Sequence, residues 1–311
     1  LNSKYEYSYT NPQPLRVAYG DFDENGVVDI VEYHFDKLTG KMVPARGRSC
    51  TTRAMPFIGK RNESFEIFGS RSLEQVYGEC LKQGTVLEAN VLHHALFLNR
   101  GNTFQARPLP AQAQFAPVFG INVADFDGDG HEDLFLAQNF FASQAETPRS
   151  DGGRGLLLRG DGKGGLQPMD GRASGLRIYG EQRGSAVADF NQDGRPDLAV
   201  TQNGAATRLF QNQRAKPGLR IRAEAGPQNP YAIGAILQLQ FEDGSKGPAR
   251  LITAGSGYWS QDSPIHVLPT PKKPTHILIQ WPNNNITSSP IPNNSPYIHI
   301  LSNGDFKGAD E

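Results

Sequence analysis

The chain has 311 residues, with 31 Lys and Arg against 32 Asp and Glu. This near-neutral balance gives no electrostatic drive toward nucleic acid or an anionic membrane. No apolar run approaches the roughly 18 residues that a membrane-spanning helix needs, so we predict neither a nucleic-acid partner nor membrane insertion. Gly (34) and Pro (22) together make about 18% of the chain, above the roughly 12% average. Such a composition favours short strands joined by many turns.

A motif occurs three times along the first two thirds of the chain, at residues 17–31, 119–136 and 183–200. Each copy has an apolar run, an Asp-Phe pair, an acidic loop with a glycine, another Asp and a second apolar run. Shorter apolar segments after a turn follow at 95–104, 155–166 and 207–212. One unit is therefore a small antiparallel meander, which must stack on copies of itself to bury both faces. Radial stacking predicts three to four blades of a β-propeller.

The interval between the first two loops exceeds the second interval by 40 residues, and residues 45–86 break the repeat. We predict an insertion in one blade there. Ser72 and Gln75 form a capping-box pair, which predicts a short helix. The insertion contains Cys50 and Cys80. They form either one disulfide or two buried thiols, and the sequence leaves both alternatives open.

After residue 215 the pattern changes to strict alternation of apolar and polar residues, as in 219–225 and 237–242. Alternation with a period of two indicates strands with one buried face. We predict an all-β chain made of propeller blades over residues 1–215, a separate β-sandwich or barrel over 216–304, and a tail over 305–311.

The three acidic loops share oxygen-bearing side chains at loop positions 1, 3, 5 and 9, with glycine at position 6. Calcium binds six to eight oxygens, and alternate residues of a tight loop can point inward together, joined by the carbonyl of position 7. The predicted ligands are Asp21, Asp23, Asn25, Val27 and Asp29; Asp125, Asp127, Asp129, His131 and Asp133; and Asp189, Asn191, Asp193, Arg195 and Asp197. The prediction is about three calcium ions; the alternative is three hairpin turns without metal.

An EF-hand would add a glutamate at position 12. Glu32 falls there in the first loop, but Leu136 and Val200 occupy that position in the other two. The flanking segments are also strand-like rather than helical, so the EF-hand interpretation fails.

Residues 119–136 and 183–200 resemble the FG-GAP/VCBS repeats of integrin-α-type propellers, in which such an acidic loop binds calcium. Three segments of the C-terminal part resemble the ASPIC/UnbV domain, which follows such repeats in secreted proteins of the cartilage acidic protein family. They are residues 229–235, residues 255–261 and the pair Trp281-Pro282. The resemblance implies a secreted or cell-surface protein. Since the sequence starts at Leu1 without a signal segment, we expect a processed or excised chain.

Aromatic residues in the C-terminal part offer a candidate ligand platform made of Tyr258, Trp259 and Trp281. The alternative is that they are core residues, as aromatics in strands usually are. We find no catalytic motif, and carboxylates held ionised by a cation are poor acid–base pairs. We therefore predict no catalytic residues and no enzyme.

These observations together predict a non-enzymatic, calcium-binding extracellular scaffold or adhesion protein with a protein or glycan partner. One alternative is a subunit of an extracellular polymer or filament, since three or four blades leave open propeller edges that favour self-association. Another is a glycan-binding module or a propeller-based hydrolase or lyase.

Overall fold

The structure is a computed structural model that describes residues 14–143 and 147–307. The start of the predicted blade region and the last four residues of the predicted tail lie outside these ranges. Strands account for 40% of the structure and helical segments for 13%. The chain divides into two compact units, one formed by residues 1–95 with 142–149 and the other by 96–141 with 150–311. The predicted boundary at residue 215 separates two kinds of sheet inside the second unit.

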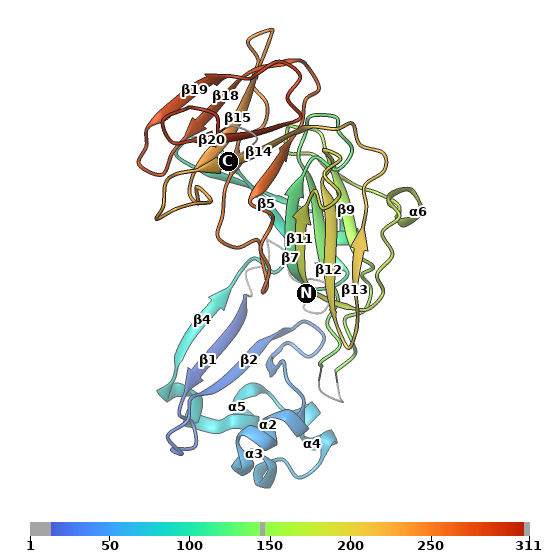
Figure 1. Cartoon of the computed structure of the whole chain (residues 1–311). Helices are drawn as coiled ribbons and strands as arrows, with labels where there is room; N and C mark the ends of the chain where they lie inside the picture. The colour runs from blue at the N-terminus through green and yellow to red at the C-terminus, as the bar shows by residue number, and fades with distance from the viewer. Residues whose placement is uncertain (1–13, 144–146, 308–311) are drawn as a thin grey trace. The chain divides into compact units, whose positions relative to one another are not determined.

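The first unit contains one antiparallel sheet with the strand order β3-β2-β1-β4 (Figure 1). Its strands are β1 (Leu15–Gly20), β2 (Asp29–Asp36), β3 (Lys41–Pro44) and β4 (Thr85–Ala89). The first acidic loop joins β1 to β2, and Gly20 pairs with Asp29 where it closes. The sheet therefore holds the two ends of the loop at a fixed distance.

The predicted insertion lies between β3 and β4 and is helical. It contains α2 (Arg48–Ala54), α3 (Pro56–Arg61), α4 (Phe65–Ser70), α5 (Leu73–Tyr77) and the 3₁₀ helix η1 (Gly78–Gln83). The predicted helix is α5, and its capping box between Ser72 and Gln75 is present. The other three helices, each six or seven residues long, were not predicted. Helices this short carry little periodicity, and packing rather than propensity stabilises them.

The insertion packs on one face of the first sheet. Ala18 and Val31 of the sheet share a buried cluster with Ile58 and Val76 of the helices. Side chains alternate between the two faces of a strand, so this face of β1 and β2 is apolar, and Phe22 of the connecting loop joins the same cluster.

Both cysteines belong to this helical insertion and are free thiols in the structure. Cys50 Sγ contacts the Arg46 guanidinium, while the Cys80 thiol donates to the carbonyl of Tyr77. The structure therefore has two thiols and no disulfide between Cys50 and Cys80. Both thiols are half-buried, whereas the prediction was two buried thiols.

The second unit begins with the hairpin of β5 (Ala95–Asn99) and β6 (Phe104–Pro108), followed by the 3₁₀ helix η2 (Ala111–Gln114). Two blade sheets come next. The first blade sheet consists of β7 (Val118–Ala124), β8 (Asp133–Gln138), β9 (Leu156–Gly160) and β10 (Leu166–Pro168). The short helix α6 (Gly171–Ser174) follows it. The second blade sheet consists of β11 (Glu181–Ala188), β12 (Asp197–Asn203) and β13 (Ala205–Phe210). In each sheet the strands follow the order of the sequence, as in the predicted meander.

These two blade sheets pack on each other through β7 and β11 (Figure 1). Phe135, Leu157 and Val200 lie in the buried cluster between them. The two sheets approach closely at Gly120, because a Cβ atom there would lie 3.0 Å from the carbonyl oxygen of Arg183. Glycine at position 120 is thus explained by backbone proximity between neighbouring blades.

The C-terminal part is a β-sandwich of two sheets, ordered β17-β14-β20 and β16-β15-β18-β19. The strands are β14 (Leu219–Glu224), β15 (Ile236–Phe241), β16 (Arg250–Leu251), β17 (Ile265–Leu268), β18 (Pro274–Gln280), β19 (Ile286–Pro290) and β20 (Tyr297–Leu301). Ile221 and Ile300 from one sheet share a core with Leu237, Leu239 and Ile277 from the other. The fold is therefore all-β, a partial propeller followed by a sandwich, as predicted.

Candidate metal centres

The three acidic loops, defined here as loop 1 (21–29), loop 2 (125–133) and loop 3 (189–197), adopt the same backbone conformation. Each joins the first two strands of a sheet. The glycines at position 6 have φ values of +85°, +94° and +80°, which glycine adopts readily. Position 4 is also left-handed in every loop, although it is Glu24 in loop 1 and Gln192 in loop 3. This second left-handed position was not predicted from the residue pattern.

The carboxylate at position 1 organises the backbone of each loop. Its Oδ2 accepts the amide of the glycine at position 6, at 2.8 Å in loop 1, 2.7 Å in loop 2 and 2.8 Å in loop 3. Its Oδ1 accepts the amide of position 5 in the same way. The side chain at position 5 in turn accepts the amide of position 7. Local hydrogen bonds of this kind favour a turn over a helix or strand.

The carboxylate at position 9 closes the loop onto the following strand. Its Oδ2 accepts the amide of the phenylalanine at position 2, at 3.1, 2.9 and 3.2 Å in the three loops. In loop 2 the other oxygen of Asp133 accepts the amide of Gly160, and in loop 3 that of Asp197 accepts the amide of Asn212. Neighbouring segments of chain thus fix the position of this carboxylate.

Carboxylates gather closely in loops 1 and 2. In each of these loops, the carboxylates at positions 1, 3 and 9 place one oxygen each within 4.8 Å of the others. The cluster of loop 1 is Asp21, Asp23 and Asp29, and that of loop 2 is Asp125, Asp127 and Asp133. In loop 1, Asp23 Oδ1 is buried and has no hydrogen-bond partner among the described residues. An orphaned carboxylate oxygen beside two other carboxylates fits a hard cation such as calcium. Loop 3 has Asn191 at position 3 and gathers fewer charges.

Burial without a cation disfavours the ionised form of these carboxylates. It raises the pKa of Asp125 to about 6 and that of Asp133 to about 7, and neighbouring aspartates add to the effect. Burial also raises the pKa of Asp29 in loop 1 and of Asp197 in loop 3. Asp193 differs, because hydrogen bonds from Asn191 and Arg195 outweigh its burial and lower its pKa.

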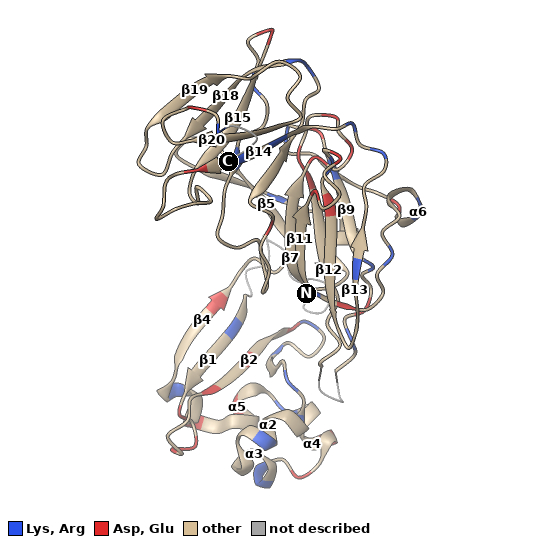
Figure 2. Cartoon of the chain, viewed as in Figure 1, with Lys and Arg blue, Asp and Glu red and all other residues tan. Residues whose placement is uncertain are grey.

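Basic residues lie at two of the loops. In loop 2, Arg159 Nε lies 2.6 Å from Asp127 Oδ2, and its Nη2 lies 2.8 Å from Asp129 Oδ2. In loop 3, Arg195 pairs with Asp193 at 2.9 Å. A second arginine, Arg220 of the sandwich, lies 2.9 Å from Asp189. Figure 2 shows basic and acidic segments together where the blade strands end near β14. No such ion pair reaches the loop 1 carboxylates in the described part of the chain.

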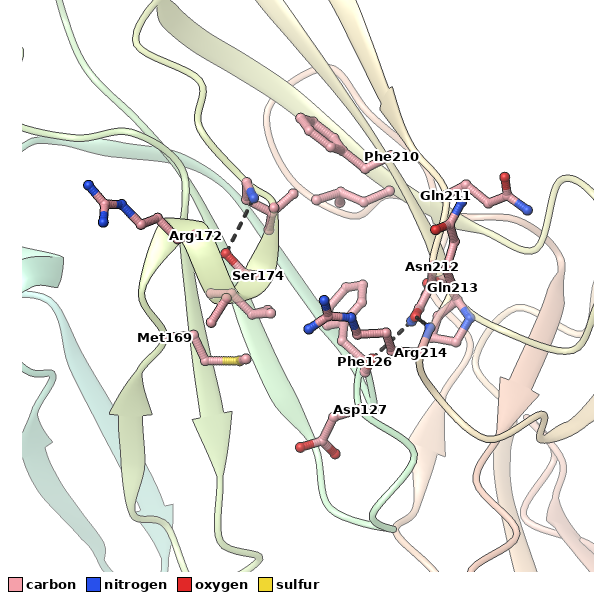
Figure 3. Close-up of a pocket in the computed structure, with 16 residues that line it drawn as sticks. Phe126, Asp127, Met169, Arg172, Ser174, Phe210, Gln211, Asn212, Gln213 and Arg214 are labelled. Carbon is pink, nitrogen blue, oxygen red and sulfur yellow. Dashed lines mark hydrogen bonds between the residues drawn. The ribbon is translucent and has the colours of Figure 1, made fainter.

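Loops 2 and 3 are also linked to each other through Asn212. Its side chain donates to the carbonyl of Phe126 in loop 2, and its backbone amide donates to Asp197 in loop 3. Asn212 lines a cavity of about 360 Å³ with Phe126, Met169 and Phe210 (Figure 3). Sequence reasoning did not identify the residues outside the loops that contact the loop carboxylates, because they lie on other elements and share no motif with the loops. These residues are Arg159, Gly160, Asn212 and Arg220.

The residues of the predicted aromatic platform are not together in the structure. Trp281 is 2% exposed and lies in the sandwich core, where its Nε1 donates to Thr287 Oγ1. Trp259 is 90% exposed, and Tyr258 packs edge-on against it with ring centroids 6.4 Å apart. Trp281 therefore does not belong to a platform with the other two, since its indole fills the core between the sheets.

The loop that carries Tyr258 contacts the blades. The Tyr258 amide donates to the carbonyl of Phe119 on β7, and Asp262 accepts from the Asn122 side chain and the Val187 amide. The segment therefore fixes the sandwich to the two blade sheets.

Comparison with known proteins supports the repeat. Residues 183–212 match the FG-GAP repeat family, a range that contains β11, loop 3, β12 and β13. No curated protein matches the chain. The matched region is short relative to the whole chain, so it identifies one repeat rather than a family for the protein. Within residues 14–143 and 147–307, no helix has the length and apolar character needed to cross a bilayer.

Proposed function

We propose that this protein is a non-enzymatic, calcium-binding extracellular scaffold or adhesion module in which calcium stabilises the blade loops. The observation that carries the proposal is the pair of three-carboxylate clusters in loops 1 and 2. Three like charges within 4.8 Å repel each other unless a cation neutralises them. The FG-GAP repeat at 183–212 supports an extracellular location, and the C-terminal sandwich is proposed to be an ASPIC/UnbV-like domain.

The residues proposed to hold calcium are the side chains at positions 1, 3, 5 and 9 of a loop together with the carbonyl at position 7. Bound calcium would supply a fixed positive charge and would keep these carboxylates ionised. A ligand that binds only the folded state stabilises it by RT ln(1 + [L]/Kd), about 2.7 kcal/mol at a hundredfold excess over Kd. Extracellular calcium modules bind at roughly 10⁻⁴–10⁻³ M, which matches a calcium-rich exterior. This role includes no catalysis.

The test is metal content by elemental analysis, together with thermal melting after EDTA treatment and after calcium addition. We expect bound calcium, and a melting temperature that falls in EDTA and recovers with calcium. Asp125→Asn should remove one ion, whereas Asp161→Asn is the matched control. Asp161 is an exposed aspartate of the β9–β10 turn that accepts two backbone amides and belongs to no acidic loop. A wild-type chain with no calcium and an unchanged melting temperature would refute the proposal.

The proposed partner is a protein or a glycan. Trp259 supports a glycan, because its indole is exposed and its backbone has a left-handed φ of 49°. Strained backbone at an exposed aromatic often accompanies ligand binding, and a flat exposed ring can stack on a sugar. The measurement is retardation of the chain in native gels containing soluble polysaccharides. Trp259→Ala should abolish any retardation, while equal retardation of both proteins would remove Trp259 from the proposal.

A further inference from the structure

Loop 3 has the same sequence pattern and backbone as the other two acidic loops, but its charge is already compensated by the protein. Its three carboxylates face two guanidinium groups, Arg195 on Asp193 and Arg220 on Asp189. In loop 2, the aspartates at positions 1, 3, 5 and 9 have Arg159 beside Asp127 and Asp129, while Arg250 of the sandwich pairs with Glu132 at position 8. Because a calcium site depends on uncompensated carboxylate oxygens, the two loops differ in their need for a cation.

The Arg220 contact is buried and fixed. The side chain of Asp189 is 1% exposed and that of Arg220 is 12% exposed. Arg220 lies on β14 between β17 and β20, with its guanidinium 5.4 Å from the ring centre of Tyr297. The 2.9 Å contact is an ion pair whose Nε–H is not aligned as a hydrogen bond. Arg159, the β9 residue that pairs with loop 2, is 51% exposed, so its side chain can move into solvent when a cation binds.

The remaining oxygens of loop 3 are also engaged. Asp189 accepts the amides of Asp193 and Gly194. Asp193 Oδ2 accepts the side-chain amide of Asn191 at 2.9 Å and pairs with Arg195. The Arg195 Nε donates at 2.7 Å to the carbonyl of Ala215, which holds its guanidinium in place. Loop 3 does not fit calcium as loops 1 and 2 do.

We propose that loop 3 is a metal-independent joint in which Arg220 of the sandwich takes the place of the cation, so that the chain binds two calcium ions, at loops 1 and 2. This inference rests on the proposed function of those two loops. A doubly charged ion beside a fixed guanidinium would be repelled, which we expect to weaken binding at loop 3 by roughly a hundredfold or more. The ion pair also connects the last blade to the sandwich, since Asp189 and Arg220 belong to different sheets.

The experiment counts bound ions by calorimetric titration with calcium chloride and measures melting in EDTA for the wild type and four variants. We expect two ions for the wild type, one for Asp125→Asn and two for Asp189→Asn. Arg220→Met should bind three, because the buried carboxylate of Asp189 is then free for a cation. Arg222→Met is the matched control, because Arg222 lies on the same face of β14 and its guanidinium lies 5.9 Å from the ring centre of Tyr231 rather than beside a loop carboxylate. This variant should bind two ions.

Loss of one ion in Asp189→Asn, or two ions rather than three in Arg220→Met, would overturn the inference. Failure of the proposed function is distinguishable, because then the wild type binds no ion and Asp125→Asn changes nothing. The melting temperature in EDTA tests the Arg220–Asp189 ion pair in the metal-free protein. Asp189→Asn and Arg220→Met should each lower the melting temperature by several degrees relative to Arg222→Met. Should Asp189→Asn fail to fold, Asp193→Asn replaces it and should also retain two ions.

Discussion

Loops 2 and 3 have the same internal hydrogen bonds but different charge compensation. In both, position 1 accepts the amides of positions 5 and 6, and position 9 accepts the amide of position 2. In loop 2 the arginine beside the Asp127 and Asp129 carboxylates is half-exposed, whereas in loop 3 a buried arginine from a different sheet contacts position 1. A shared loop backbone therefore does not establish a shared ligand. The surroundings of the carboxylates decide whether a cation is needed.

The largest expected effect comes from breaking the buried pair of loop 3. In EDTA, Arg220→Met leaves the Asp189 carboxylate buried without its guanidinium. Removing one partner of a buried ion pair costs about 3–5 kcal/mol. We expect a loss near the lower end of that range, because Asp189 keeps two backbone hydrogen bonds. Urea unfolding monitored by circular dichroism measures it, with Arg222→Met as the control, and equal stability of both variants would show that the pair contributes little.

The next effect is the response of loop 2 to calcium. At a hundredfold excess over Kd, calcium at one loop should stabilise the fold by about 2.7 kcal/mol. Asp125→Asn should remove that gain, while Asp189→Asn should retain it. Melting temperatures with and without calcium test this difference between the loops. If the calcium-dependent rise in melting temperature required Asp189 and not Asp125, loop 3 rather than loop 2 would be the calcium site.

The pH dependence should separate the loops further. Burial raises the pKa values of Asp125 and Asp133 to about 6 and about 7, from the ordinary aspartate value of 3.8. The metal-free protein therefore has their full stabilising contribution below about pH 4 and loses it as pH rises toward 7. Calcium binds the ionised carboxylates, so its stabilising effect should be greater at pH 8 than at pH 5.

Asp193 in loop 3 has a lowered pKa, so its contribution is lost only as pH falls below 3.8 toward its folded pKa. Because the raised pKa of Asp133 falls between pH 5 and pH 8, the melting temperature of the wild type in EDTA should decrease over this range. In Asp133→Asn this decrease should be smaller. A trend that is unchanged in Asp133→Asn would assign the pH dependence to other groups, among them Asp197, whose pKa is also raised.

The smallest effect is expected at Arg159. This side chain is half-exposed, and exposed ion pairs contribute about 0–1 kcal/mol. Arg159→Ala should leave stability in EDTA within that range and raise the calcium affinity of loop 2 a few-fold, because a positive charge beside the site is removed. Calorimetric titration measures it. A rise as large as that predicted for loop 3 in Arg220→Met would mean that exposure does not distinguish the two arginines.

The sequence by itself determined the features that depend on neighbours along the chain. The glycine at position 6, the alternating oxygen side chains and the two strands around each loop follow from short-range geometry. The capping box of α5 is local in the same sense, and the period-two alternation after residue 215 correctly predicted the sandwich strands, since one face of each is buried.

Only the tertiary structure decided which loop carboxylates meet an arginine. Arg220 reaches Asp189 from a strand 31 positions along the chain, and Asn212 links loop 2 to loop 3 across two sheets. Likewise, Trp281 is in the core and Trp259 in solvent although both are tryptophans in aromatic motifs. Such contacts arise when separate sheets pack, and no local pattern of residues encodes which side chain of one sheet will meet a carboxylate of another.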